Sequence, residues 1–139
     1  MIYGQTVNLN SLSDIRQFLS TRNIALKKRW GQNFLIDDNI RRRLAASADI
    51  REGQSVWEIG PGLGSLTEKI LQQDLGIKIY LFEIDRGIIS YLRQDFIPAF
   101  RDKRAEIDII EGDFISVKTI ESYMVPLGYG RYMVQIPEY

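Results

Sequence analysis

The amino-acid sequence predicts an α/β fold with a doubly wound parallel sheet, and three observations support this prediction. From residue 55 onward, apolar runs of strand length alternate with stretches of helical character, as expected for strands joined by helical crossovers. The first apolar run leads into the turn Gly60-Pro61-Gly62-Leu63-Gly64, and the second ends at Glu83, 19 residues after the last of these glycines. Nucleotide-binding domains have a glycine turn and an acidic residue at about this spacing. The sequence therefore also predicts a nucleotide-like ligand.

A short amphipathic helix is predicted before the sheet, over residues 12–21. Ser11 and Asp14 have the spacing of an N-terminal capping box, and Leu12, Ile15 and Leu19 then recur on one helical face. The stretch 25–35, with its clustered charges, glycine and amides, is expected to be a loop.

A second helix is predicted to begin at Asp37 or Asp38. Its apolar residues Ile40 and Leu44 are expected to point inward. Its outer face is then basic, because three arginines lie around the flank: Arg41, Arg42 and Arg43.

The remaining elements alternate regularly along the chain. Ser65 and Glu68 have capping-box spacing at the start of the helix after the glycine turn, and Pro98 is expected to close the helix that begins near Arg86. We expect strands over 55–59, 78–83, 106–111 and 131–136, and helices over 65–74, 86–97 and roughly 116–124.

The predicted sheet is incomplete at its C-terminal end, since a doubly wound domain usually continues through further strands. We therefore expect an N-terminal helical and basic arm over residues 1–50 and the first part of a nucleotide-binding domain over 51–139. The chain is expected to be monomeric, although an open edge on the last strand would invite pairing with another chain.

Charge is distributed unevenly along the 139 residues. The 18 basic and 18 acidic residues cancel, but residues 1–51 contain nine Lys or Arg against four Asp or Glu, and the rest contain nine against fourteen. A basic front half suits contact with a phosphate backbone. Ordinary scatter of surface charge is the alternative.

The sequence contains neither cysteine nor histidine. Disulfides, thiolate nucleophiles, Cys/His metal sites and imidazole bases are thereby excluded, and no metal is expected. No apolar run approaches the roughly 18 residues of a membrane helix, and no leader pattern is seen. We therefore expect a cytoplasmic protein that needs no strong base.

The glycine turn by itself is compatible with a dinucleotide, with a methyl donor, or with a tight structural connection. Glu58 lies two residues before Gly60, and its carboxylate would repel a pyrophosphate. A cofactor with a positive sulfonium and amino group and no phosphate suits such a site better. S-adenosylmethionine is such a cofactor, and a dinucleotide oxidoreductase is disfavoured.

A further acidic residue, Asp113, follows the predicted strand 106–111. Strands of a parallel sheet end at the same edge, where ligands bind in open α/β folds. Asp113 is therefore placed to accept a hydrogen bond from the amino group of an adenine. Each acid could instead be a helix cap or a loop residue. Three of them in order, Glu58, Glu83 and Asp113, favour the cofactor site.

Four segments closely resemble the ribosomal RNA adenine dimethyltransferases of the KsgA/RsmA type. The resemblance covers roughly residues 24–116, and it implies a class I, Rossmann-like S-adenosylmethionine-dependent methyltransferase fold. The family's C-terminal helical domain is expected to be missing from this chain. The segments are Lys28-Arg29-Trp30-Gly31-Gln32-Asn33-Phe34-Leu35-Ile36-Asp37, Glu58-Ile59-Gly60-Pro61-Gly62-Leu63-Gly64-Ser65-Leu66-Thr67, Phe82-Glu83-Ile84-Asp85-Arg86 and Gly112-Asp113.

The resemblance implies roles for residues that match the family. Asn33 and Leu35 would contact the methionine end of the cofactor, Glu83 would hold its ribose and Asp113 its adenine. The full predicted cofactor set is Asn33, Leu35, Gly60, Gly62, Glu83, Ile84, Asp113 and Phe114. The residues expected to face rRNA phosphates are Lys27, Lys28, Arg29, Arg41, Arg42 and Arg43, with a solvated charged face as the alternative.

In the family, an Asn-Leu-Pro-Tyr motif after the fourth strand grips a flipped adenine, whose N6 attacks the sulfonium methyl in line and leaves S-adenosylhomocysteine. Here the corresponding residues are Gln135-Ile136-Pro137-Glu138-Tyr139. Gln135 and Pro137 are the candidate catalytic positions. Gln135 is one methylene longer than Asn, and Glu138 replaces the aromatic residue, so we expect cofactor binding to be better preserved than methyl transfer.

The resemblance thus implies dimethylation of adenine N6 in small-subunit ribosomal RNA during ribosome biogenesis. Two alternatives remain. One is a noncatalytic rRNA-binding or assembly module that keeps the basic face, and the other is a large-subunit rRNA adenine methyltransferase of the macrolide-resistance type.

Overall fold

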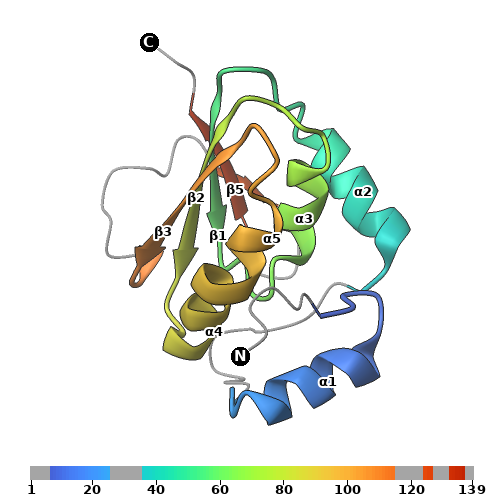
Figure 1. The fold of residues 1–139 in the computed structure, drawn as a ribbon. Helices are drawn as coiled ribbons and strands as arrows, with labels where there is room; N and C mark the ends of the chain where they lie inside the picture. Colours follow the sequence, from blue (N-terminus) through green and yellow to red (C-terminus); the bar gives the residue numbers. More distant parts are fainter. Residues whose placement is uncertain (1–6, 26–35, 115–123, 127–131, 137–139) are drawn as a thin grey trace.

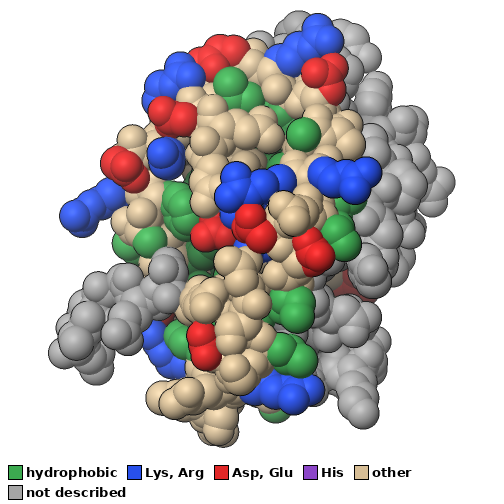
Figure 2. Space-filling model, turned by 90° about the vertical axis from the view of Figure 1, so that its right-hand side faces the viewer, with side chains coloured by type: hydrophobic (Ala, Val, Ile, Leu, Met, Phe, Trp, Pro, Cys, Tyr) green, Lys and Arg blue, Asp and Glu red, His purple; other side chains and the backbone are tan. Residues whose placement is uncertain are grey.

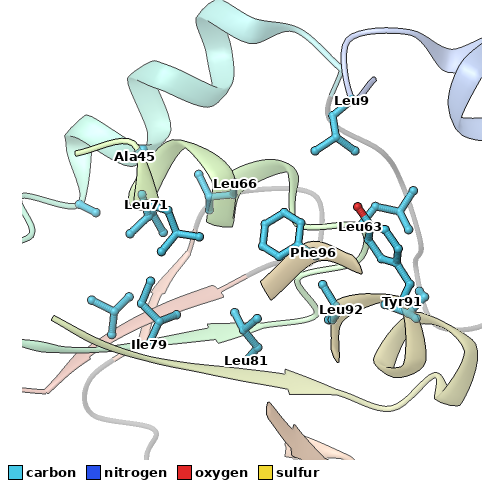
Figure 3. Packing of buried hydrophobic residues seen from close by; sticks show 14 of the residues in the cluster. Leu9, Ala45, Leu63, Leu66, Leu71, Ile79, Leu81, Tyr91, Leu92 and Phe96 are labelled. Atoms are coloured by element: carbon cyan, nitrogen blue, oxygen red, sulfur yellow. The ribbon is translucent and has the colours of Figure 1, made fainter. Parts of the chain in front are cut away.

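The structure, a computed structural model, describes residues 7–25, 36–114, 124–126 and 132–136, and for the last two ranges it describes only the backbone. Figure 1 shows a twisted sheet with the helices gathered on one of its sides. The buried apolar side chains lie between this sheet and the helices (Figure 3). A mixed α/β layer arrangement with a parallel core is confirmed.

The three parallel strands follow the sequence prediction. Strand β2 (Lys78–Glu83) pairs in parallel with β1 (Ser55–Ile59) and with β3 (Glu106–Glu111), and all three have the predicted bounds. Their alternating burial places Val56, Ile79 and Leu81 under the helices.

The last two strands differ from the prediction. The sheet order is β3-β2-β1-β5-β4, in which β5 (Tyr132–Ile136) runs antiparallel to β1 and β4 (Met124–Pro126) runs antiparallel to β5. The predicted parallel direction of the last strand is therefore wrong, as is its open edge, because β5 lies between two neighbours. Only five residues separate β4 from β5, which suits a hairpin and is too few for a parallel crossover.

The predicted helix over 116–124 is wrong at its last residue, because Met124 belongs to β4. Residues 115–123 lie outside the described part of the chain.

The first two helices begin where their caps predict. Helix α1 (Leu12–Thr21) is capped by Ser11, whose Oγ accepts from the backbone N–H of Asp14 at 3.2 Å. Helix α2 (Asp38–Ser47) is capped in the same way by Asp37. The third cap was predicted wrongly, because α3 (Ser65–Leu71) begins after Gly64 and has no side-chain cap.

The helix predicted over 86–97 is continuous but not uniform. It begins as α4 (Arg86–Tyr91), widens into the π-helical turn η2 (Leu92–Phe96), and ends as the short α5 (Ile97–Ala99). Wide turns of this kind are rare and often lie near functional sites. In this chain the turn carries Asp95 and Phe96, which are both buried.

Helix α2 is rotated relative to the prediction. Ile40 is 41% exposed, whereas Arg41 and Ala45 are buried. Arg41 finds polar partners on α3, at the Ser65 carbonyl oxygen and at Glu68. The predicted inward position of Ile40 is therefore wrong.

We predict that Gly64→Ala destabilises the fold more than Gly60→Ala. Both glycines have positive φ, 87° and 67°, so each alanine costs about 1 to 2 kcal/mol in backbone strain. A Cβ on Gly64 would also lie 2.4 Å from the Phe96 ring, whereas a Cβ on Gly60 would meet no atom within 4 Å. This overpacking adds about 1 to 3 kcal/mol. Urea unfolding measures both values, and equal losses would contradict the packing described for Gly64.

Candidate functional site

The glycine turn lies at the carboxyl edge of β1 and is tied to β2. Gly60, Gly62 and Gly64 all have positive φ, and the Gly60 N–H donates to the Phe82 carbonyl oxygen at 2.8 Å. A Cβ on Gly60 would point into open space. The turn therefore leaves room for a ligand beside Gly60, whereas Gly64 is required by packing against Phe96.

Glu83 ends β2 beside this turn and is 4% exposed. Its Oε1 accepts hydrogen bonds from the backbone N–H groups of Ile84 at 2.8 Å and Asp85 at 2.9 Å. Burial raises the pKa of the Glu83 carboxyl above its usual value, while hydrogen bonds from the N–H groups of Asp85, Ile84 and Gly62 act in the opposite direction. The carboxylate is thus fixed in orientation and linked to the glycine turn.

Ile84 follows Glu83, and its large apolar side chain is 38% exposed. It lines a hollow of about 440 Å³ together with Asn23, Ile24, Ala25, Asp85, Arg86 and Gly87. Asp85 does not point freely into this hollow, because its Oδ1 caps α4 by accepting from Gly87 N–H at 2.8 Å and Ile88 N–H at 3.2 Å. The hollow therefore has an apolar wall next to Glu83.

Asp113 and Phe114 lie just beyond β3 at the same edge. Glu111 pairs with Glu83 in the sheet register, and the Gly112 N–H donates to the Glu83 carbonyl oxygen at 3.0 Å. Asp113 is exposed, and the Phe114 ring packs against Phe82 with 5.0 Å between centroids. The structure thus brings six predicted cofactor residues to one edge: Gly60, Gly62, Glu83, Ile84, Asp113 and Phe114.

Glu58 does not reach this edge with its side chain. It is fully buried and accepts from Thr67 Oγ1 at 2.5 Å. Side chains alternate along a strand, so Glu58 shares the face of Val56 and lies under α3. The prediction that Glu58 faces a cofactor is therefore wrong, and its charge no longer discriminates between cofactors.

The candidate catalytic position Gln135 is also displaced. In the antiparallel pairing, Gln135 lies opposite Val56 and Tyr132 lies opposite Ile59. Three residues of strand separate Gln135 from the edge, or roughly 10 Å. This register does not support Gln135 as a catalytic residue at that edge, and the other candidate, Pro137, lies outside the described residues.

Five other predicted site residues also lie outside the described residues. They are Asn33 and Leu35 of the cofactor set, and Lys27, Lys28 and Arg29 of the RNA-facing set.

Arg41 was expected on the exposed face of α2, and this position is wrong. Its side chain is buried and donates to the Ser65 carbonyl oxygen at 3.0 Å, to Glu68 Oε2 at 2.9 Å, and to the side chain of Asn10. It joins the N-terminal segment to the start of α3, so it cannot reach an RNA phosphate.

The other two arginines of α2 remain exposed. Arg42 Nε lies 2.6 Å from Asp38 Oδ2, and Lys69 Nζ lies 2.6 Å from Asp38 Oδ1. Hydrogen bonds from Lys69 and Arg42 lower the pKa of Asp38 to about 2. Basic and acidic side chains are interspersed on the helical face of the molecule in Figure 2, so this face is less uniformly basic than predicted.

Apart from Ile84, no residue that lines this hollow was predicted as a site residue, and three of them, Asn23, Ile24 and Ala25, follow α1. Asn23 has a φ of 53° directly after α1, a conformation in which asparagine often ends a helix. An asparagine after a predicted helix was the available signal for the turn, but it did not indicate where the turn packs.

Within the described ranges, no helix is long and apolar enough to cross a membrane. The same residues contain no group of three or more Asp or Glu side chains arranged to hold a metal ion.

Comparison with known proteins identifies similar sequences. A family model described as "Ribosomal RNA adenine dimethylase" matches residues 23–135. Proteins named "Ribosomal RNA small subunit methyltransferase A" are similar: that of Borreliella burgdorferi (strain ZS7) is 39% identical over 114 residues, or 82% of this chain and 38% of the relative. That of Treponema denticola is 38% identical over 76% of this chain and 34% of the relative. That of Lactococcus lactis subsp. lactis is 33% identical over 78% and 37%.

The chain thus spans less than two fifths of the length of these curated relatives, as 38% of the first is covered. The matched residues include the glycine turn, Glu83 and Asp113, and they begin after α1.

We predict that Arg41→Met costs about 2 to 4 kcal/mol of unfolding free energy, because it leaves the buried Ser65 carbonyl oxygen and the partly buried Glu68 carboxylate without their donor. The adjacent Arg42→Met is the control. Its side chain is 64% exposed, so its effect should stay within the error of a denaturant titration. Similar losses for the two variants would contradict the burial described for Arg41.

Proposed function

Because the chain belongs to the ribosomal RNA adenine dimethylase family, we propose that it carries the S-adenosylmethionine-binding part of an enzyme that dimethylates adenine N6 in small-subunit ribosomal RNA. Residues 51–139 would form the first part of the methyltransferase domain, and residues 1–50 its N-terminal arm.

The observation that carries this proposal is the position of Glu83 beside the glycine turn. Its carboxylate is held by backbone N–H groups on both sides, from Gly62 and from Ile84 and Asp85. A carboxylate offers about four lone-pair sites, so Glu83 can accept one ribose hydroxyl while it keeps these three bonds. The open space beside Gly60 suits a ligand that approaches the backbone closely.

The neighbouring residues fit the adenine of the cofactor. Ile84 offers an exposed apolar surface on which a base can lie, and Asp113 offers an exposed carboxylate to the amino hydrogens. Phe114 is held by contact with Phe82 and Trp57, and this contact fixes the chain that carries Asp113. Asn33 and Leu35 would complete the site at the methionine end.

The bound cofactor would supply an electrophilic methyl group. The chain's own contribution is orientation: Glu83 holds the ribose, Ile84 and Asp113 hold the base, and the turn at Gly60 and Gly62 allows close approach. Alignment of this kind is the main requirement of an in-line displacement. Gln135 has no step in this proposal, because the described register places it away from the edge.

For the RNA partner we propose contact between rRNA phosphates and the basic residues that the structure leaves available. Arg42 and Arg43 are exposed on α2, and Lys27, Lys28 and Arg29 belong to the same proposal. Arg41 is excluded by its burial. Small-subunit RNA is chosen over large-subunit RNA because the similar proteins carry small-subunit names.

The register of β5 favours a second candidate function, a noncatalytic rRNA-binding module that holds cofactor without methylating. Transfer of tritiated methyl groups to unmodified small-subunit particles separates the two. Incorporation above a cofactor-only blank supports the enzyme, and a blank result with calorimetrically proven cofactor binding supports the module.

We predict that Glu83→Ala weakens the affinity for S-adenosylhomocysteine by about 1.5 to 3 kcal/mol, the size of a lost charge-assisted hydrogen bond. Glu106→Ala is the matched control, because Glu106 is exposed at the opposite end of the neighbouring strand. Titration calorimetry measures both. An unchanged affinity in Glu83→Ala would refute the ribose assignment.

We also predict that affinity for S-adenosylhomocysteine falls when the pH is lowered from about 8 to about 5. The ionised Glu83 is the hydrogen-bond acceptor, and its raised pKa makes it protonate at a higher pH than an exposed glutamate. The contribution of Glu83 to folding stability changes with pH in the opposite direction to the affinity. Because the pKa of Glu83 is raised in the folded state, this contribution is full at low pH and is lost as the pH rises through that pKa.

Glu83→Gln is the control for the pH series, because an amide does not titrate. Its affinity should be lower and nearly independent of pH below neutrality. If wild type and Glu83→Gln showed the same pH dependence, the titrating group would belong to the ligand or to another residue.

A further inference from the structure

Helix α1 precedes the residues that match the family, which begin at 23. It is nevertheless well packed, because Ile15 and Leu19 belong to the buried core at 1% and 3% exposure. The family match therefore assigns no role to a helix that the structure fixes firmly. Its contacts lead to two parts of the proposed nucleoside site, the glycine turn and the hollow that Ile84 lines.

The first contact is an ion pair between the end of α1 and the π-helical turn η2. Arg22 Nη1 lies 2.7 Å from Asp95 Oδ2, and the Asp95 side chain is 2% exposed. The Arg22 guanidinium also lies 5.2 Å from the centre of the Phe18 ring, and Phe18 packs edge-on against Tyr91 at 5.0 Å. A buried carboxylate needs its cation, so Arg22 fixes α1 against the turn.

The π-helical segment η2 also contacts the glycine turn. Phe96 follows Asp95, and its ring fills the space above Gly64, where a Cβ would lie 2.4 Å away. Figure 3 shows Phe96, Leu63 and Tyr91 close together in this part of the core. A shift of η2 would therefore also shift Gly64, the last glycine of the turn.

The second contact is made by the residues that follow α1. The Ile24 N–H donates to the Leu19 carbonyl oxygen at 2.9 Å, which folds the chain back across the helix end. Ile24 Cγ1 lies 3.2 Å from the place that a Cβ on Gly87 would occupy. Ile24 thus packs directly on the start of α4 and forms, with Asn23 and Ala25, the wall of the hollow that Ile84 lines.

We infer that α1 positions the wall of the hollow that Ile84 lines, and that this hollow is part of the nucleoside site. The Arg22–Asp95 ion pair holds α1 in that position. Arg22 and Asp95 are positioning residues, since they act through Ile24 and Phe96 and touch no cofactor themselves. The inference rests on the proposed cofactor site and adds to it an element outside the matched region. The pocket wall at Ile24 and the packing of Phe96 on Gly64 would then both depend on one ion pair.

The test is the affinity of the whole chain for S-adenosylhomocysteine, measured by calorimetry well below the thermal transition of each variant. Arg22→Gln should weaken binding about tenfold, within the usual range of coupling between a remote contact and a site. Ile24→Ala should weaken it comparably without touching the ion pair. Arg22→Lys should restore part of the affinity, because an ammonium can pair with Asp95 but lacks the planar guanidinium that lies over Phe18.

Arg16→Gln is the matched control, because Arg16 is an exposed arginine on the same helix. Its affinity should equal that of the wild type. Hydrogen exchange at the Gly87 and Ile88 amides should accelerate in Arg22→Gln and not in Arg16→Gln. This measurement needs no ligand and detects a loosened wall of the hollow directly.

The outcomes separate the two proposals. Wild-type protein that binds no S-adenosylhomocysteine would contradict the proposed function and this inference with it. Wild-type binding that Arg22→Gln and Ile24→Ala leave unchanged would overturn this inference and leave the proposed function intact. A lower melting temperature in Arg22→Gln with unchanged affinity and exchange would show that α1 only stabilises the fold.

Discussion

Backbone hydrogen bonding continues the parallel sheet past the ends of its strands, and the candidate site depends on this constraint. Gly60 donates to the carbonyl of Phe82, and Gly112 donates to the carbonyl of Glu83. These two bonds hold the turns after β1 and β3 against the end of β2. Three segments that are distant in sequence therefore meet around one carboxylate before any side chain contributes.

Much of this arrangement could be predicted from the sequence, because its causes are local. A capping serine, apolar alternation and a run of glycines each act within a few residues, and they placed α1, β1, β2 and β3 correctly. The meeting of Glu83 and Asp113 at one edge follows from parallel pairing alone. Both strands end there whatever their side chains are.

The errors have non-local causes. The apolar run at 132–136 suits a strand in either direction, so its antiparallel pairing and the position of Gln135 depend on neighbours that the pattern does not reveal. Three consecutive arginines look alike in sequence, but the rotation of α2 buries Arg41 and leaves Arg42 in solvent. The position of Glu58 is an exception, because the local alternation of side chains along β1 puts it on the same face as Val56.

The packing at Gly64 links the glycine turn to a residue 32 positions later in the chain. The Phe96 ring occupies the volume that a side chain at 64 would need, so the third glycine is dictated by a neighbouring helix and not by the ligand. Sequence drift at these two positions should therefore be correlated: a smaller residue at 96 would relax the steric demand at 64, although the backbone angle there would still favour glycine. A glycine inside a ligand-binding sequence motif can thus be required by packing in the protein interior.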